Sequence, residues 1–448
     1  MPNRKCPDSV SSAVRNYLNP VTRAAVSCWP TATGDDMKTT LRPRTSGTAV
    51  LVGALVTALA LAGCGTAHSS GAAGTGTTAA TTPSASPPAT GTTATPAAAS
   101  TPATPAGGPV PSGFAATSVT FVSTQEAFVL GTAPCSHAPC TSIVRTLDRG
   151  GSWRGLPAPV VTLGPAMSAS GPAVWGIRFA TPSHGFVFGN GLWETTDGGE
   201  HWAQAAAPAG SILSLEVIDG QVLAVTATCS SQSGCGSTGS LERRPLSGGA
   251  WQQVTPVKDA EAGTDAIATQ ARVAAVLDGT TVIVTSDGGL STVSHPVPCT
   301  TEGIAVAESV AVTGPDSLAL LCAGQAAMGS VDKTVYVSGN LGQTWTQAGA
   351  PPRGGDPIGL AGGTPDQLVV TAASGASFLY YSGDGATQWG TAYDNGDGGM
   401  GFNDLGFTTT SDGVVVHGPA LSDGNSEGRP GQLLLTSNGG ATWQAVNF

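Results

Sequence analysis

The chain has 448 residues, of which 18 are basic and 29 are acidic, and its formal net charge at pH 7 is −11. Only 10% of the residues are charged, and no basic patch with interleaved aromatic residues occurs. These features argue against a nucleic-acid partner and against electrostatic attachment to an anionic membrane surface.

The first 63 residues are organised like an export signal. Lys38, Arg42 and Arg44 precede an apolar run at residues 49–62, and small residues follow it. The run is too short to cross a bilayer comfortably, so we predict a signal peptide over residues 37–63. Export signals begin near the start codon, and residues 1–36 are therefore predicted to be a misassigned N-terminal extension.

The end of this signal, Leu61-Ala62-Gly63-Cys64, resembles a bacterial lipobox. The resemblance implies that Cys64 becomes the lipidated first residue of the mature protein, with a diacylglyceryl thioether and an added N-acyl chain such as palmitate. Two lipid signals are enough for stable anchoring, here on the extracytoplasmic side of the cell membrane. An ordinary signal peptide and a buried helix are the alternatives.

Residues 64–113 are predicted to form a disordered tether. No Asp, Glu, Lys or Arg occurs between Gly65 and Gly113, where Ala, Thr, Pro, Ser and Gly dominate. Such a segment cannot bury enough apolar surface to offset the entropy lost on ordering. At about 3.1 Å per residue its full extension would be roughly 150 Å.

A motif of the form Ser/Thr-x-Asp/Asn-x-Gly-x-x-Trp recurs seven times after the tether. Residues 146–153, 195–202, 338–345 and 436–443 are good copies. Three copies are incomplete, because Leu246, Thr292 and Ala386 replace the acid, the Trp and the Gly, respectively. The last positions of successive copies are 41 to 54 residues apart, a spacing typical of four-stranded propeller blades.

The residue types of the motif predict a self-satisfied hairpin turn. The Asp or Asn side chain bonds backbone N–H groups ahead of it, and the Gly tolerates a positive φ. The Trp anchors the turn to a neighbouring layer, and short β-branched or apolar strands precede most copies. The expected structural residues of the turns are Asp148, Trp153, Asp197, Trp202, Trp251, Asp287, Asn340, Trp345, Asp384, Trp389, Asn438 and Trp443.

The motif resembles the Asp-box (BNR) repeat of sialidases, sortilin-type domains and photosystem II assembly-factor-like lipoproteins. In that family the box connects the third and fourth strands of a propeller blade. The resemblance implies an all-β fold over residues 114–448, a seven-bladed β-propeller of four-stranded antiparallel blades. The ring would close by packing of blade 7 against blade 1, unless residues 110–116 add a strand.

Six cysteines follow Cys64, and an even number in an exported protein predicts disulfides. Fifteen pairings are open, of which sequence locality favours Cys135–Cys140, Cys229–Cys235 and Cys299–Cys322. In a propeller all six would decorate the face opposite the boxes, with Cys322 ending the second strand of blade 5. A zinc site is the alternative, although the spacings do not fit paired Cys-x-x-Cys knuckles.

The same face is predicted to collect long oxygen-rich loops. Residues 394–399 are expected to form a loop leading into blade 7, and residues 422–429 lie between its second and third strands. Either run could hold Ca²⁺, but neither has the full ligand spacing, and turn chemistry explains both. We expect no cofactor and no bound metal, and take as the candidate binding face Arg178, Tyr393, Asp394, Asp397, Asp423 and Glu427.

Catalytic constellations are not recognisable in the sequence. A sialidase would need an arginine cluster, but only Arg178 is expected near the central channel, and the arrangement around Gly176-Ile177-Arg178-Phe179 does not match the family signature. A glycosidase needs two opposed carboxylates, which sequence alone cannot pair. We therefore predict a monomeric, lipid-anchored, non-catalytic propeller that binds a protein or a cell-envelope glycan. A sialidase-like glycoside hydrolase and an assembly factor for a membrane protein complex are the alternatives.

Overall fold

The computed structural model describes residues 107–137, 140–164, 171–230, 234–258, 266–300, 305–418 and 431–448. The predicted extension at residues 1–36, the signal peptide, Cys64 and the tether up to residue 106 lie outside this part of the chain, as do Asp423 and Glu427. Within the described ranges no helix is long and apolar enough to cross a membrane.

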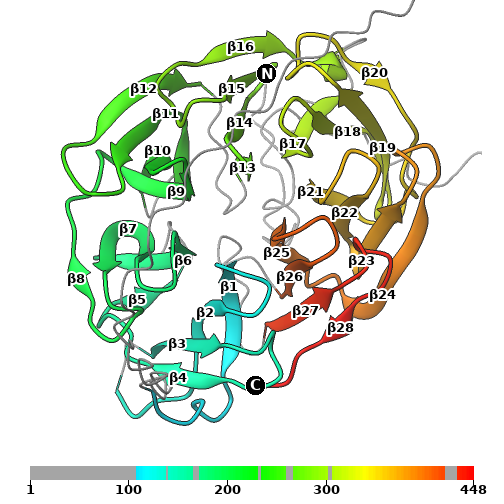
Figure 1. Cartoon of the computed structure of the whole chain (residues 1–448). Helices are drawn as coiled ribbons and strands as arrows, with labels where there is room; N and C mark the ends of the chain where they lie inside the picture. The colour runs from blue at the N-terminus through cyan, green and yellow to red at the C-terminus, as the bar shows by residue number, and fades with distance from the viewer. Residues whose placement is uncertain are drawn as a thin grey trace, which may run out of the picture. The chain divides into compact units, whose positions relative to one another are not determined.

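Seven four-stranded sheets make up the described chain, and they lie as blades around a central axis (Figure 1). Each sheet uses four strands that are consecutive in sequence, so the predicted fold class is confirmed. Blades 1 to 3 consist of β1 (Ala115–Phe121), β2 (Ala127–Thr132), β3 (Thr141–Thr146) and β4 (Arg154–Leu156); β5 (Thr162–Leu163), β6 (Ala173–Phe179), β7 (Gly185–Thr195) and β8 (Ala203–Gln204); and β9 (Ser211–Ile218), β10 (Gln221–Ser230), β11 (Gly234–Pro245) and β12 (Gln252–Val257).

The remaining blades follow the same plan, with one 3₁₀ turn, η3 (Pro298–Thr300), between blades 4 and 5. Blades 4 to 7 consist of β13 (Ile267–Gln270), β14 (Val273–Asp278), β15 (Thr281–Thr285) and β16 (Val293–Pro296); β17 (Val306–Val312), β18 (Leu318–Ala327), β19 (Ser330–Ser338) and β20 (Thr346–Gln347); β21 (Asp356–Gly362), β22 (Leu368–Ala373), β23 (Gly375–Ser382) and β24 (Gly390–Gly398); and β25 (Phe402–Phe407), β26 (Gly413–His417), β27 (Gln432–Thr436) and β28 (Gln444–Ala445).

Blade 2 departs from the all-antiparallel plan. Its short strand β5 pairs with the start of β6 in the parallel direction. The long strand β7 pairs with β6 up to Asn190 and with β8 through Trp193 and Glu194. Because Gly191, between these halves, has a φ of 135°, β7 can take the places of both the second and the third strand.

The core is divided into seven apolar clusters, one between each pair of adjacent blades. On β2, Phe128 and Leu130 pack toward blade 2, whereas Val129 packs toward blade 7. Both faces of a central strand are therefore buried, which explains why these strands are continuous apolar runs rather than alternating ones. The rings of Phe128 and Phe179 stack with their centroids 3.6 Å apart across the first of these interfaces.

Ring closure between blades 7 and 1 uses packing, without exchange of a strand among the described residues. The amide of Ala116 donates to the carbonyl of Gly431 at 3.1 Å. The rings of Phe114 and Phe448 meet edge to face at 4.9 Å. Residues 110–116 do not add a strand to blade 7, because residues 110–114 belong to no strand and Ala115 and Ala116 begin β1; Gly108 instead forms a bridge with Gly155 at β4.

The seven repeated turns are not equally regular. In six of them the fourth and fifth positions both have a positive φ, including the incomplete turn of blade 6, where Ala386 has a φ of 67°. The third side chain accepts the amide four residues ahead, as Asp287 does from Ser291 at 2.9 Å. Blade 3 is the exception, since its positive φ values fall one residue later, at Gly248 and Gly249. Of the three incomplete copies, only that of blade 3 therefore has a different turn.

The hydrogen bonds that Asp287 accepts in the turn of blade 4 predict how its replacement changes the stability of the protein. Asp287 also accepts the hydroxyl of Thr285 at 2.8 Å, so Asp287→Ala should lower the free energy of unfolding at pH 7 by about 1 kcal/mol. Asp287→Asn should cost less, because Asn340 and Asn438 occupy the same position in other turns. Urea denaturation of the three proteins measures the difference, and equal losses for both variants would contradict the assigned bonds.

The same carboxylate predicts a pH dependence. The hydroxyl of Ser291, followed by its amide, lowers the pKa of Asp287 to about 2. Because the pKa is lowered on folding, the stabilisation is present above the unfolded value of about 4 and is lost as the pH falls toward 2. The stability difference between the wild type and Asp287→Asn should therefore shrink over this interval.

Candidate functional site

The blades have two distinct ends. In blade 1, Ala127 pairs with Thr146 beside the repeated turn, and Thr132 pairs with Thr141 at the other end. That other end carries the Cys135–Cys140 disulfide, and in blade 3 the Cys229–Cys235 pair likewise lies opposite the turn. We call these ends the turn face and the disulfide face.

The three predicted disulfides are present, as Cys135–Cys140, Cys229–Cys235 and Cys299–Cys322. All six thiols are thereby used, so the zinc alternative is wrong. The expectation that all six cysteines decorate one face is also wrong for the third pair. Cys299 and Cys322 are each 2% exposed in the core between blades 4 and 5, because β18 continues past Cys322 to Ala327.

Three predicted binding residues lie on a strand instead of a loop. Tyr393, Asp394 and Asp397 belong to β24, the outer strand of blade 6, which pairs with β23 through two register shifts. Asp394 is exposed, whereas the side chain of Asp397 is only 9% exposed. The loop expected at residues 394–399 is therefore wrong, since the ladder with β23 extends to Gly398.

Asp397 is held in a buried polar network with two residues that the sequence did not single out. His417 Nε2 lies 2.6 Å from one carboxylate oxygen, and the Ser377 hydroxyl donates to the group at 3.0 Å. The amide of Gly399 donates to it at 2.8 Å. Burial raises the pKa of Asp397, but the bonds from Gly399 and His417 outweigh it and leave that pKa below its usual value. Asp397 is thus an anchor between blades 6 and 7.

The network continues toward the protein surface. The hydroxyl of Tyr393 lies 3.3 Å from His417 Nδ1, and Asn395 Nδ2 donates to that hydroxyl at 3.2 Å. If Nε2 of His417 donates to Asp397, Nδ1 is left to accept the Tyr393 hydroxyl. The side chain of Asn395 is therefore fixed in orientation by a chain of bonds that begins at a buried carboxylate.

Asn395 and His417 line a pocket at the junction of blades 7 and 1, which we call the seam pocket. Its volume is about 670 Å³, within the range of small-molecule and side-chain sites. The strand ends that surround it, at Phe114, His417 and Gln432, belong to the disulfide face. The pocket is lined by Val110, Pro111, Ser112, Gly113, Phe114, Asn395, Met400, His417, Gly431, Gln432, Val446, Asn447 and Phe448.

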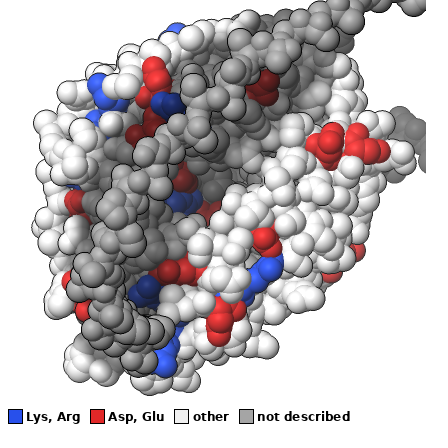
Figure 2. Space-filling view, in the orientation of Figure 1, with Lys and Arg blue, Asp and Glu red and all other residues white. Residues whose placement is uncertain are grey.

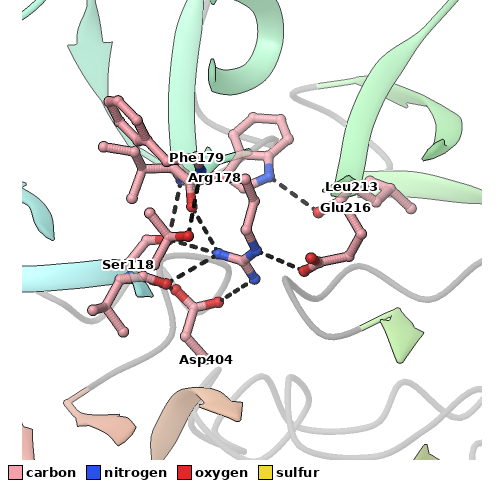
Figure 3. Close-up of polar contacts among 10 residues, drawn as sticks. Ser118, Arg178, Phe179, Leu213, Glu216 and Asp404 are labelled. Carbon is pink, nitrogen blue, oxygen red and sulfur yellow. Dashed lines mark hydrogen bonds and ion pairs between the residues drawn. The ribbon is translucent and has the colours of Figure 1, made fainter. Parts of the chain in front are cut away.

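Arg178 lies on β6 at the central channel, as predicted (Figure 3). Its Nε donates to Glu216 of blade 3 at 2.6 Å, and Nη2 donates to Asp404 of blade 7 at 2.9 Å. Nη1 donates to the carbonyl of Ile177 at 2.8 Å. Because each nitrogen has an acceptor, Arg178 has little capacity left to bind a substrate carboxylate.

The charge state of this cluster follows from burial and pairing. Burial raises the pKa of Glu216, although the nearby guanidinium of Arg178 opposes that shift. Burial lowers the pKa of Arg178, but Asp404 and Glu216 together bring it above its ordinary value. The adjoining channel cavity has a volume of about 250 Å³, and Asp404, Glu216 and Arg178 all contribute to its wall.

A second buried cation lies at the disulfide face of blade 5. Lys333 is 1% exposed, and five backbone carbonyl oxygens lie 2.7 to 3.2 Å from its ammonium, which shares its three N–H groups among them. Four of them belong to Pro352, Arg353, Gly354 and Gly355, in the segment that connects blade 5 to blade 6. Burial lowers the pKa of Lys333 to about 8, so the ammonium form still predominates at neutral pH.

Charged residues are otherwise sparse on the surface. Figure 2 shows acidic and basic side chains spread singly or in small groups over an otherwise uncharged face. Among the described residues, no group of three or more His, Cys, Asp or Glu side chains could hold a metal ion. The oxygen-rich run at residues 422–429 lies outside the described residues.

No protein family and no curated protein matches the chain by sequence. Solved structures are similar to it at low identity. YCF48 bound to D1 peptide is 17% identical, with a TM-score of 0.49 and coverage of 74% of this chain and 95% of that one. YCF48 from Cyanidioschyzon merolae is 13% identical, with a TM-score of 0.46 and coverages of 74% and 98%. Oligogalacturonate lyase from Vibrio parahaemolyticus is 8% identical, with a TM-score of 0.49 and coverages of 73% and 92%. We draw no functional inference from these similarities.

The Arg178 cluster predicts strong energetic coupling. Asp404→Ala would leave the guanidinium with one carboxylate and the amide of Val119 without its acceptor at 2.8 Å. We expect a loss of about 3 kcal/mol in the free energy of unfolding. In a double-mutant cycle by urea denaturation, Arg178→Met and Asp404→Asn should couple by about 1–3 kcal/mol. The exposed pair Arg272–Asp219 is the matched control, with a coupling below about 1 kcal/mol, and equal couplings would contradict the assignment.

The carbonyl cage of Lys333 predicts a second large effect. Lys333→Met removes the ammonium that is shared among five carbonyls and should destabilise the protein by about 3 kcal/mol. Thermal and urea unfolding measure this loss. The same substitution at the exposed Lys258 should change stability by less than about 0.5 kcal/mol. A tolerated Lys333→Met would mean that the connecting segment is held by other contacts.

Proposed function

We propose that the protein is an extracytoplasmic, lipid-anchored scaffold that binds a protein partner at its disulfide face and performs no catalysis. In this proposal Cys64 carries the lipid and residues 64–106 act as the tether, because residues 107–113 contact blades 1 and 7. The propeller presents a rigid face, and loops and strand ends determine specificity. Presentation of a binding surface, without a chemical step, is the mechanism.

The observation that carries the proposal is the seam pocket on the disulfide face. One wall of the pocket contains Asn395 and His417, whose side chains are connected by hydrogen bonds to Tyr393 and Asp397. These bonds make the wall rigid. Rigid surfaces lose less conformational entropy on binding, which favours a recognition role.

Exposed apolar side chains on the same face support a protein partner over a glycan. Met328 is fully exposed at the tip of the β18–β19 hairpin, at the end away from the repeated turn. Ile358, near the start of β21, is 41% exposed. Such side chains can join the apolar core of a protein–protein contact, although exposed apolar residues such as Leu147 and Leu290 also occur on the turn face.

The glycoside hydrolase alternative has one observation in its favour. Glu216 and Asp404 are two carboxylates at one cavity, and burial raises the pKa of Glu216, as a general acid requires. Arg178 bonds to both of them, however, and a cavity of about 250 Å³ is small for a sugar flanked by two catalytic groups. We therefore favour the binding role.

Proximity labelling from the full-length protein in its native cell tests the proposal. Met328→Asp with Ile358→Asp should reduce labelling of the partner at least tenfold, because both substitutions charge the disulfide face. The matched control is Leu147→Asp with Leu290→Asp, which charges exposed apolar positions on the turn face.

The outcomes separate the alternatives. One stoichiometric protein partner or membrane complex, lost only with the disulfide-face pair, supports the scaffold. Equal labelling by both double variants would overturn it. Release of aryl glycosides by the wild type, abolished by Arg178→Ala, would favour the hydrolase. Cys64→Ser should move the protein from the membrane fraction to the soluble fraction, and unchanged membrane retention would refute the lipid anchor.

A further inference from the structure

We propose that the seam pocket binds an apolar side chain, with its flanking backbone, from an uncharged peptide segment of the partner. This inference rests on the proposed function, because it names the chemistry that the disulfide face recognises. Nothing in the sequence pattern pointed to this pocket, since its walls come from residues far apart in the chain: residues 110–114, 395–417 and 431–448.

The pocket has apolar walls beside its polar groups. Val110, Pro111 and Phe114 contribute from the segment before β1, and Met400, Val446 and Phe448 contribute from blade 7 and its approach. The edge-to-face rings of Phe114 and Phe448 hold two of these walls together. Methionine adapts its shape to different apolar groups, so Met400 suits a site for a side chain.

The polar groups of the pocket are amides. Asn395 uses one N–H to bond Tyr393, and its carbonyl oxygen has no partner among the described residues. The side chains of Gln432 and Asn447 likewise have no partner there. Side-chain amides offer both a donor and an acceptor, which is the pairing that a peptide backbone requires.

The lack of charged side chains among the described lining residues limits the classes of ligand that the pocket can bind. Among the described residues that line the pocket, none has an Asp, Glu, Lys or Arg side chain, and both ring nitrogens of His417 already have partners. A phosphate or an acidic glycan would be desolvated there without a counter-charge, which is costly. A neutral peptide segment meets no such penalty.

Three of the blade interfaces have a contact that the seam lacks. Trp202, Trp251 and Trp345 each donate an indole N–H to a carbonyl of the preceding blade, at Pro157, Ala206 and Pro296. In blade 1 the indole N–H of Trp153 is buried without a partner, beside Phe448. Trp389 and Trp443 bond within their own turns instead, so the buried indole at the seam differs from both in having no acceptor among the described residues.

The test uses a variant that fills the pocket. Ser112 is exposed at the pocket, so Ser112→Trp should occupy it without burying a polar group. Asn447→Trp, also at an exposed position, is the second filling variant. The matched control is Ser136→Trp, an exposed position in the Cys135–Cys140 loop of the same face. Urea denaturation confirms that each variant is folded.

The probe is a displayed library of random decapeptides, charged residues included, selected on the full chain. Selected peptides should share an apolar residue and bind both filling variants at least tenfold more weakly than the wild type and Ser136→Trp. Equal binding by the filling variants, a charged consensus or no enrichment would each overturn the proposal. Stronger binding of a panel of neutral oligosaccharides would do the same, in favour of a glycan.

Two outcomes distinguish an incorrect pocket assignment from an incorrect proposed function. If Ser112→Trp still labels the partner and the Met328/Ile358 double variant does not, the scaffold role stands and the pocket assignment is wrong. If neither variant affects labelling, both are wrong.

Discussion

The Asp404 carboxylate closes the ring at its centre. One of its oxygens accepts the amide of Val119 in blade 1, and the other accepts Arg178 of blade 2, which also bonds to Glu216 of blade 3. At other interfaces a hydroxyl accepts the amide of the next blade: Ser118 accepts the amide of Ile177, and Ser309 accepts that of Leu360. A hydroxyl can link two adjacent blades, whereas a carboxylate can also reach a third through an arginine. No strand is exchanged between blades 1 and 7 in the described chain. The ion cluster therefore connects four blades, whereas an exchanged strand would connect only two.

This closure determines what the channel can do. The guanidinium of Arg178 is buried and carries two ion pairs, and removing one partner would leave an uncompensated charge. A substrate carboxylate would have to compete with Asp404 and Glu216, which are already in place and need no further desolvation. The channel is therefore best explained as a structural centre, and recognition is better sought on a face. On the disulfide face, the buried ammonium of Lys333 likewise stabilises the structure, because it bonds carbonyls of the segment that connects blades 5 and 6.

Local patterns predicted the fold because propeller blades are local structures. The repeated turn, its spacing and the apolar strands before it depend on neighbours within one blade, and the disulfides favoured by locality are also those observed. The contacts that define the candidate site, in contrast, join residues that are far apart in the sequence. Arg178 and Asp404 are 226 residues apart, and a buried histidine at the end of β26 resembles any packed residue in the sequence. Residues 394–398, rich in Gly and Asp, suggested a loop, but hydrogen bonding to β23 overrides that composition. An edge strand with register shifts tolerates such residues.

The position of the seam pocket follows from the way the ring closes. Six interfaces join blades that are consecutive in the chain, so a short connection positions each pair. The seventh joins blades at opposite ends of the propeller sequence and has no such connection. It is held by the backbone bond from Ala116 to Gly431 and by side-chain contacts: the Asp404 cluster at the centre, Arg149 with Asp412 near the turn face, and Phe114 with Phe448 at the rim. Between these contacts the indole of Trp153 stays unpaired, and a cavity of about 670 Å³ opens on the disulfide face. A ring closed without a chain connection therefore leaves a gap at this interface, and the described residues around the gap provide both apolar walls and side-chain amides.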